Sequence, residues 1–488
     1  MAHFIPSHIA SLHRASGAEI NKVKLDSHYY EKPLHRPNEP QIPKPQLFQP
    51  LASPNNNRND LPTISECAAH LELLEVFHTL RERVLQSTEL DNSFGIKPNI
   101  KTVYRKRYSS AKRKYESYTV SIKDNTFQTR RKQKWPYFLE LAVGRFVQWI
   151  KIIDGISLSS TSTESADSPL GLGLLPPVDV LMVWHAFLLN PDDFNFYCVK
   201  HRLQRMREAS LPWLQIHEAI NSRNWSYSLP KAHGDWLQEN TQLAPDLFQE
   251  LVEIGKKPSG KYILSEYRSE SKGRIPLSQF IRDLWGVSRS QISFAQIVEV
   301  TRSEARKNSP LVENVERQLK FVEKMHAHLW IRSPAVEGTI RRAIDRYEKF
   351  LQLFRDYPDR TMVPTLDVDL AWHTHLCSPE QYRASLFQRT GRMVNHDDKL
   401  GKSFLHRRFD KTHDLFSVVF GQQYHVCLCW DCEAISSAME AFATKDDVDI
   451  VDDFELEADD FVQRVEEDVR YHRAVEIARR KGITLPVR

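Results

Sequence analysis

Two stretches of the chain, 188 residues apart, carry the same pattern of residue types. They read PPVDVLMVWHAFLLNPDDF over 176–194 and PTLDVDLAWHTHLCSPEQY over 364–382. Proline, aspartate, a Trp-His pair, a second proline and an aromatic residue recur in one order at a constant offset. Upstream, RFVQWI over 145–150 corresponds to RYEKFL over 346–351, and a Ser-rich insertion in the first copy accounts for the larger offset there. The pattern predicts a structural unit that occurs twice.

Each copy reads as helices joined by short loops. Asp179 and Asp367 are N-cap residue types, so we expect the Trp-His helix of each copy to start near them. Asn190-Pro191 and Ser378-Pro379 end that helix and start a third one, with proline at its first position. Gly391 is expected to close the third helix of the second copy. The predicted fold class is mainly α, with a duplicated helical unit whose two Trp-His helices pack about a pseudo-twofold axis.

The residues that both copies share favour a structural interpretation. Tryptophan fills the space between helices, and a buried histidine satisfies a backbone carbonyl. This core motif comprises Asp179, Trp184, His185, Asp367 and Trp372, and His373 follows Trp372 as His185 follows Trp184.

The second copy also carries residue types that bind metal. Asp369 and His373 stand four residues apart and share a helix face, whereas the first copy has Leu181 in place of Asp369. A carboxylate at this spacing can orient an imidazole. Such residues suit zinc or non-haem iron, and a metal-free acid–base site is the remaining alternative. The candidate ligands are Asp369, His373, His375, His396 and Asp398.

A second candidate metal site lies in HVCLCWDC over 425–432. Cys429 and Cys432 have a spacing that suits chelation or redox chemistry, and Cys427 and His425 are further possible ligands. Four ligands within eight residues are crowded around one tetrahedral ion. A cluster of reduced thiols is therefore an equal alternative to a zinc site.

Composition divides the chain further. Residues 1–61 are Pro-rich and expected to be mostly disordered, whereas helical periodicity begins at Ile64. The expected organisation is a first repeat half over 62–205 with the insertion at 155–174, a helical connector over 206–319, a second half with the cysteines over 320–435, and a charged tail over 436–488. In the tail an acidic block precedes a basic one, which indicates a partly helical, solvated terminus or a tail that folds back.

Residues 101–134 are basic, with twelve Lys or Arg against two acids and four interleaved tyrosines. Basic side chains neutralise phosphates and aromatic rings stack on bases, so RNA binding through Arg105, Lys106 and Arg107 is one interpretation. The other is a solvated helix face followed by a loop.

Several classes of protein are disfavoured. No apolar run approaches the length of a membrane span, and the first residues do not form a secretory signal. The six cysteines are sparse outside one cluster, which fits a reducing compartment, so a cytoplasmic or nuclear location is expected. The chain contains no GxSxG, Walker, GxGxxG or HExxH motif.

The motifs DVDLAWHTH over 367–375, DVLMVWHAFLLNP over 179–191, NHDD over 395–398 and CLCWDCE over 427–433 resemble the glycine-rich domain protein-like family of plants and fungi. The resemblance covers roughly residues 70–435. Within this family, the chain looks like a fungal-type member without the glycine-rich tail. It implies no established reaction. It does imply links to stress and development, as for plant members, some of which also carry an RNA-binding-like motif.

Three functions follow as hypotheses. The first is a helical interaction or regulatory protein with protein partners. The second is a metal-dependent enzyme, an oxygenase or hydrolase with iron or zinc, that uses the DVDLAWHTH and NHDD segments. The third is an RNA-associated protein that acts through 101–134. Whether the chain is an enzyme is left open by the sequence.

Overall fold

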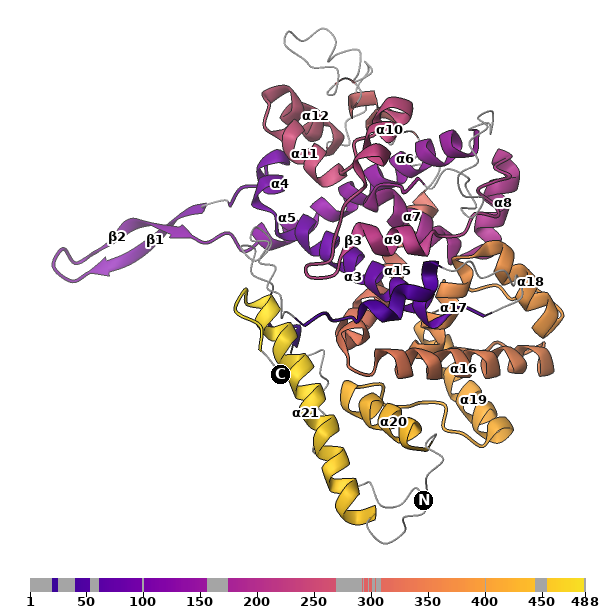
Figure 1. Cartoon of the computed structure of the whole chain (residues 1–488). Helices are drawn as coiled ribbons and strands as arrows, with labels where there is room; N and C mark the ends of the chain where they lie inside the picture. Colours follow the sequence, from indigo (N-terminus) through magenta and orange to yellow (C-terminus); the bar gives the residue numbers. More distant parts are fainter. Residues whose placement is uncertain are drawn as a thin grey trace.

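The computed structural model describes residues 20–24, 40–52, 61–98, 101–155, 174–268, 292, 294–296, 298–300, 303, 309–399, 401–443 and 454–486. Helices dominate these residues, so the prediction of a mainly α fold is confirmed (Figure 1). The Ser-rich insertion lies almost wholly outside them. No helix among the described ranges is both long and apolar enough to cross a bilayer.

The centre of the molecule is α3 (Ile64–Gln86), which is buried around most of its circumference. A reciprocal capping box starts the helix: Thr63 accepts from the Glu66 backbone amide, and the Thr63 amide donates to the Glu66 carboxylate at 2.7 Å. Helices from both halves of the chain pack on it, including α6 (Lys134–Gly155), α15 (Ser309–His328), α16 (Val336–Asp356) and α17 (Leu366–Leu376). The start predicted at Ile64 is confirmed.

The repeated sequence pattern corresponds to two sets of helices in the same order. The first set is α6, α7 (Val178–Leu188) and α8 (Pro191–His201), and the second is α16, α17 and α18 (Pro379–Thr390). The predicted starts of α8 and α18 at proline are confirmed, as is the end of α18 at Gly391, which has φ of +72°. Duplication and the pseudo-twofold axis stay predictions.

The Trp-His helices start near Asp179 and Asp367 as predicted, at Val178 and Leu366, but neither aspartate is the N-cap residue. Pro177 and Thr365 occupy the cap positions, and both aspartates lie inside the first turn. Each aspartate instead accepts a hydrogen bond from an arginine of the preceding long helix. Arg145 Nε lies 2.7 Å from Asp179 Oδ2, and Arg346 Nε lies 2.7 Å from Asp367 Oδ2. Each guanidinium compensates the charge of a carboxylate that burial would otherwise leave unpaired.

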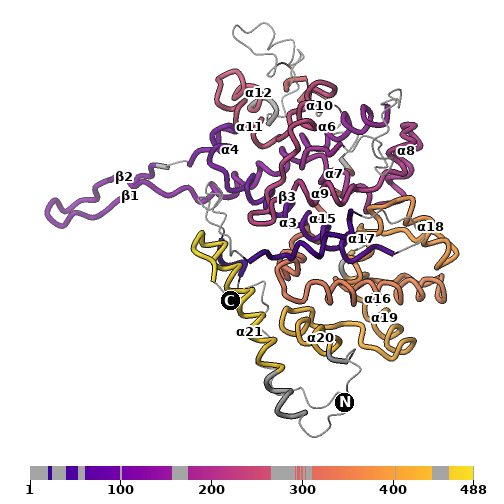
Figure 2. Tube along the Cα trace, viewed as in Figure 1, coloured from indigo at the N-terminus to yellow at the C-terminus, as the bar shows by residue number. Residues whose placement is uncertain are grey.

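The basic segment forms an antiparallel hairpin, not the solvated helix face that was the alternative to RNA binding. Strands β1 (Lys101–Ser109) and β2 (Lys114–Ile122) pair with Tyr108 opposite Tyr115, and the hairpin projects from the helical body (Figures 1 and 2). Short helix α5 (Phe127–Lys132) follows it. Aromatic and β-branched residues at alternate positions favour strands, and the basic charge obscured that signal.

Residues 206–268 of the expected helical connector contain a two-residue strand pair and the short helices α9 to α12. The strands are β3 (Ile220–Asn221) and β4 (Ser226–Tyr227), and the helices are α9 (Trp213–Ala219), α10 (Lys231–Thr241), α11 (Leu247–Gly255) and α12 (Pro258–Arg268). In the remainder of the chain α4 (Thr88–Ser93), α19 (Lys402–Phe420) and α20 (Trp430–Ala443) complete the helical body. These helices extend the single hydrophobic core that α3 occupies.

Parts of both termini pack on the body. The 3₁₀ helix η2 (Pro45–Ala52) lies on α3 and α9, so the prediction of disorder does not hold for residues 40–52; most of the rest of 1–61 lies outside the described residues. The C-terminal helix α21 (Phe454–Arg480) packs on α20. Glu476 of α21 is buried against Arg332, at 3.1 Å. The described part of the charged tail therefore folds back on the body and is not a solvated terminus.

Candidate metal centre

Three of the predicted ligands come together at one point. Asp369 and His373 lie one turn apart on α17, and His396 comes from the segment that follows α18. Their donor atoms lie within 4.8 Å of one another. Two imidazoles and one carboxylate form the donor set of many zinc and non-haem iron sites.

The spacing of the donor atoms fits one small cation. His373 Nε2 lies 3.1 Å from His396 Nε2 and 3.3 Å from Asp369 Oδ1, and the third edge, from His396 Nε2 to Asp369 Oδ1, is 3.7 Å. Bonds of about 2.0–2.1 Å in tetrahedral geometry place ligand atoms about 3.3 Å apart. The Asp369 side chain is 22 % exposed, whereas His373 is buried, and the Oδ1 atom of Asp369 that faces the two imidazoles is itself buried.

The fold fixes the orientation of His396. Its Nδ1 donates to the backbone carbonyl of Leu189 at 3.0 Å, which leaves the Nε2 lone pair directed at Asp369 and His373. The indole of Trp372 packs edge-on against the His396 ring, with ring centroids 5.0 Å apart. The hydroxyl of Tyr382 accepts from Trp372 Nε1 at 3.0 Å and donates to the Val394 carbonyl at 2.6 Å. Trp372 thus both fills the core and positions a ligand.

The first helix set lacks this arrangement. Phe194 corresponds to Tyr382 and has no hydroxyl, and the buried Trp184 Nε1 finds no hydrogen-bond acceptor among the described residues. Trp184 packs against Trp149 instead, with ring centroids 5.5 Å apart. With Leu181 in place of Asp369, the first set cannot bind a metal in the same way.

Local charges set the protonation of the three ligands. Burial alone would raise the pKa of the Asp369 carboxyl, but His373 and His396 hold it well below its usual range. Burial lowers the pKa of His373, although Asp369 opposes the shift. Burial would also lower the pKa of His396, but Asp369 and Asp398 together raise it. An ionised carboxylate beside a neutral His373 is the state in which both can bind a cation.

Two residues predicted as ligands lie outside this cluster. His375 is buried on another face of α17, where its Nδ1 lies 3.1 Å from the hydroxyl of Tyr347. Asp398 pairs with Arg317 Nε at 3.0 Å and accepts from Gln318 Nε2 at 2.8 Å, both on α15. Asp398 therefore acts on His396 through its charge, and it anchors the segment that carries His396.

His185 of the core motif belongs to a hydrogen-bonded chain that the sequence did not reveal. Its Nε2 lies 2.8 Å from His70 Nε2, and His70 Nδ1 lies 2.8 Å from Thr374 Oγ1. Because Thr374 donates to the Leu370 carbonyl, His70 Nδ1 donates to Thr374 and His185 donates to His70. The expected carbonyl partner of His185 is thus replaced by His70, which lies between Ala69 and Leu71 in α3. These hydrogen bonds link α7, α3 and α17.

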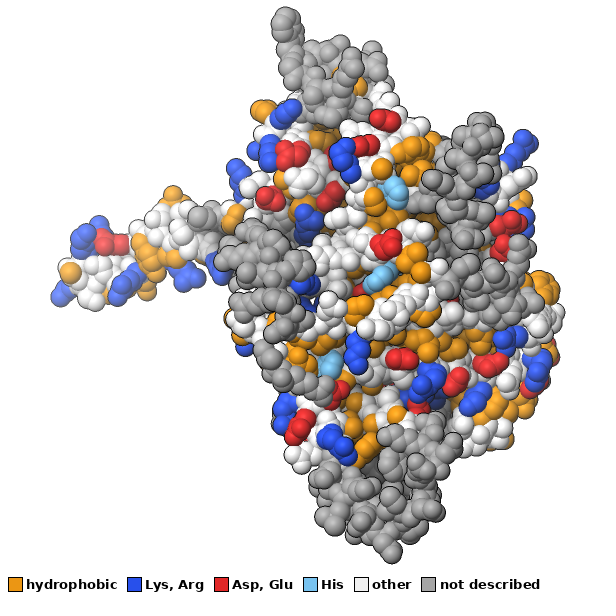
Figure 3. All heavy atoms as spheres, viewed as in Figure 1, with side chains coloured by type: hydrophobic (Ala, Val, Ile, Leu, Met, Phe, Trp, Pro, Cys, Tyr) orange, Lys and Arg blue, Asp and Glu red, His pale blue; other side chains and the backbone are white. Residues whose placement is uncertain are grey.

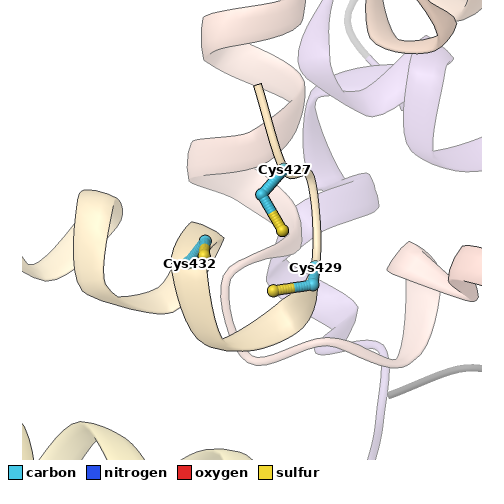
Figure 4. A group of neighbouring side chains, drawn as sticks. All are labelled: Cys427, Cys429 and Cys432. Carbon is cyan, nitrogen blue, oxygen red and sulfur yellow. The ribbon is translucent and has the colours of Figure 1, made fainter. Parts of the chain in front are cut away.

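The second candidate cluster is also formed, without His425. The sulfurs of Cys427, Cys429 and Cys432 lie within 4.8 Å of one another (Figure 4). A hydrogen bond from Cys432 lowers the pKa of the Cys429 thiol to about 6. His425 lies against Phe409, with ring centroids 6.2 Å apart.

The remaining predicted site residues are elsewhere. Arg105, Lys106 and Arg107 lie on β1, in the hairpin that projects from the helical body (Figure 1). A hollow of about 460 Å³ between α3 and α15 is lined mainly by charged side chains, including Arg81, Glu323 and Arg317. None of the three clustered ligands lines this hollow, so its shape gives no information about a substrate for them.

The fold and the site define a mainly helical protein with a carboxylate and two imidazoles gathered beside its central helix. Residues 260–385 match the family described as glycine-rich domain-containing protein-like. The matched range includes Asp369 and His373 and ends before His396.

Two relatives from Arabidopsis thaliana are similar to the chain. Glycine-rich domain-containing protein 1 is 25 % identical over 313 residues, which cover 61 % of this chain and 30 % of the relative. Glycine-rich domain-containing protein 2 is 33 % identical over 94 residues, or 17 % of this chain and 12 % of the relative. The matches thus span less than a third of either relative. No solved structure matches the chain.

Proposed function

We propose that the chain is a metal-binding protein whose site is Asp369, His373 and His396. The observation that carries the proposal is the triangle of donor atoms, with edges of 3.1, 3.3 and 3.7 Å, on three side chains from two segments. In the neutral imidazole of His396 the proton is on Nδ1, which donates it to Leu189, so Nε2 offers a lone pair. A cation would contact this lone pair, His373 Nε2 and Asp369 Oδ1 at once, and it would displace the second proton that the raised pKa of His396 favours.

The number of ligands indicates the kind of metal site. Structural zinc sites in proteins are closed by four protein ligands, whereas catalytic ones use three and leave a position for water or substrate. Three ligands with a partly exposed carboxylate therefore favour a reactive site over a structural one. Zinc would lower the pKa of a bound water, and iron(II) would bind a small ligand such as oxygen. A hydrolase or an oxygenase is the corresponding class of enzyme.

The test is metal analysis of the full chain purified without an affinity tag. We expect near-stoichiometric zinc or iron in the wild type, and its loss in Asp369→Asn and His373→Ala. His413→Gln changes an exposed histidine and serves as the matched control. Circular dichroism checks that each variant is folded. Folded wild type that binds neither ion, as purified or after titration, would refute the proposal.

The hairpin favours a second candidate function, an interaction with RNA. Tyr104 and Tyr115 are 77 % and 70 % exposed, far more than aromatic side chains in a protein interior. Lys and Arg side chains are exposed on the same hairpin (Figure 3). Register pairs Tyr108 with Tyr115 and Arg105 with Tyr118, so each face of the ribbon carries both rings and charges. Single-stranded nucleic acid is bound by this combination of stacking and phosphate neutralisation.

Salt-dependent binding to a single-stranded RNA tests this function. The variant Arg105→Glu/Lys106→Glu/Arg107→Glu should abolish binding and the salt dependence. Its matched control is Lys200→Glu/Lys231→Glu/Lys256→Glu, which makes the same charge change at exposed positions elsewhere. Equal loss in both variants would show that net charge, not the hairpin, governs binding. If RNA does not bind, the exposed rings and charges still support the interaction-protein hypothesis, with an acidic protein surface as the partner.

A further inference from the structure

A second ligand cluster lies about the start of α20, separate from the three-ligand cluster on α17. Cys427 and Cys429 precede the helix, and Cys432 lies in its first turn (Figure 4). The three sulfurs lie within 4.8 Å of one another, and exposure ranges from an open Cys427 to a buried Cys429. Tetrahedral bonds of about 2.3 Å from sulfur to zinc place sulfurs about 3.8 Å apart, so small side-chain rotations would close this cluster on one ion.

The backbone between the first two cysteines is held in an unfavourable conformation. Leu428 has φ of +43°, a left-handed conformation that costs a residue with a side chain roughly 1–2 kcal/mol. A leucine adopts it only where the surroundings impose it. In an extended chain the Cys427 and Cys429 side chains would share a face about 6–7 Å apart. The turn at Leu428 brings their sulfurs within 4.8 Å of each other.

Two buried tryptophans impose this conformation. Trp330 Nε1 donates to the Leu428 carbonyl at 2.9 Å, and Trp430 Nε1 donates to the His328 carbonyl at 2.8 Å. Both indoles are about 1 % exposed. The turn is therefore anchored to the core on both sides, and the cysteines are positioned before any ligand arrives.

The charges beside the cluster are also compensated. Asp431 and Glu433 flank Cys432 and would repel thiolates, but Arg473 of α21 pairs with Asp431 and Arg342 of α16 pairs with Glu433. The amide groups at the start of α20 also favour negative charge. These arginines and amides compensate negative charge on the three sulfurs, and the arginines connect the cluster to α16 and α21.

We propose that Cys427, Cys429 and Cys432 bind one thiophilic closed-shell cation, zinc or cuprous copper. Thiolates select these ions among the metals common in cells. Cuprous copper is satisfied by three sulfurs, whereas zinc takes a fourth ligand from solvent at the open side beside Cys427. The bound ion would stabilise the packing of α20 and α21 on the body. This inference rests on residues that the proposed function does not use.

The experiment uses the full chain under reducing, anaerobic conditions, with cobalt(II) as a spectroscopic probe for zinc and with cuprous ion in a separate titration against a chelator. We expect one ion per chain, with sulfur-to-cobalt charge-transfer absorption in the near ultraviolet. Cys427→Ser, Cys429→Ser and Cys432→Ser should each remove that absorption. His373→Ala should retain it, so the two sites are tested independently. Binding of only cobalt and zinc, or of only cuprous ion, identifies the metal.

A measurement on the wild type alone guards against variants that fail to fold. Metal should protect the three cysteines from alkylation, and removal of the metal should expose them, as mass spectrometry of peptides would show. Absence of both absorption and protection would overturn the proposal. So would a disulfide between Cys429 and Cys432 in protein alkylated at the moment of cell lysis, because that bond removes two of the three ligands.

Discussion

His396 donates a hydrogen bond from Nδ1 to the backbone carbonyl of Leu189, at 3.0 Å and across 207 residues of sequence. Leu189 ends α7 in the first helix set, and His396 follows α18 in the second. The first set thus has no ligands of its own but orients a ligand of the second. This explains why a site on one copy of the pattern still depends on the other.

The two roles of His396 can be separated by substitution. In His396→Asn the amide nitrogen can replace Nδ1 as a donor to Leu189, but no group reaches the position of Nε2. We expect metal affinity to fall by more than about 100-fold while the stability of the metal-free protein stays close to that of the wild type. His396→Ala should lose affinity and also about 1–3 kcal/mol of stability, because the Leu189 carbonyl loses its partner. Urea unfolding of the metal-free proteins and titration with cobalt(II) measure the two effects. Equal stability of the two variants would contradict the role of the Leu189 contact.

Stability should fall as the pH decreases below neutrality. Burial lowers the pKa of His185 to about 3 and, with a smaller contribution from His326, that of His78 to about 4. The unfolded chain binds these protons near pH 6.5 and the folded chain does not, so stability is complete above pH 6.5 and is lost as the pH falls. Each histidine accounts for about 2 kcal/mol between pH 7 and pH 5.

The matched comparison for this pH effect is His185→Gln, which can still donate to His70 but cannot take up a proton. Its free energy of unfolding should fall less than that of the wild type between pH 7 and pH 5, by about 2 kcal/mol. Urea titrations at several pH values measure the difference. Parallel pH profiles would show that His185 does not titrate as a neutral buried group.

The two arginine–aspartate pairs should differ in energetic importance. Arg145 and Asp179 are fully buried, whereas Arg346 keeps 12 % of its side chain exposed. Asp179→Asn removes the negative charge that pairs with the buried Arg145 guanidinium, and we expect the free energy of unfolding to fall by about 3–5 kcal/mol. Asp367→Asn should cost less, because water reaches Arg346. Denaturant unfolding of both variants gives the comparison, and a larger loss for Asp367→Asn would overturn the ranking by burial.

The sequence predicted the helix pattern and the Asp369–His373 pair because both depend on local spacing. A separation of four residues places two side chains on one helix face in any helical context. The sequence could not show that His375 lies outside the site, because packing decides which face of α17 meets His396. It also missed His70, because a histidine among apolar residues has no local signature. The charge in 101–122 suggested a helix face and a loop, whereas these residues form a hairpin in which Tyr108 pairs with Tyr115.

The C-terminal helix should contribute to global stability, although its sequence is mostly charged. Glu476 on α21 is buried and meets Arg332 at 3.1 Å and Arg480 at 2.8 Å. Glu476→Gln would leave the buried Arg332 without its carboxylate, at a cost of about 3–5 kcal/mol. Glu466→Gln, on the same helix, removes a partly exposed charge with a loose ion pair to Arg470 at 3.9 Å and should change stability by less than about 0.5 kcal/mol. Thermal unfolding should therefore show one transition that shifts only in Glu476→Gln. If the two variants unfolded alike, α21 would be an appendage of the fold, and the support that we assign to the thiol cluster through Arg473 would have to come from α16 alone.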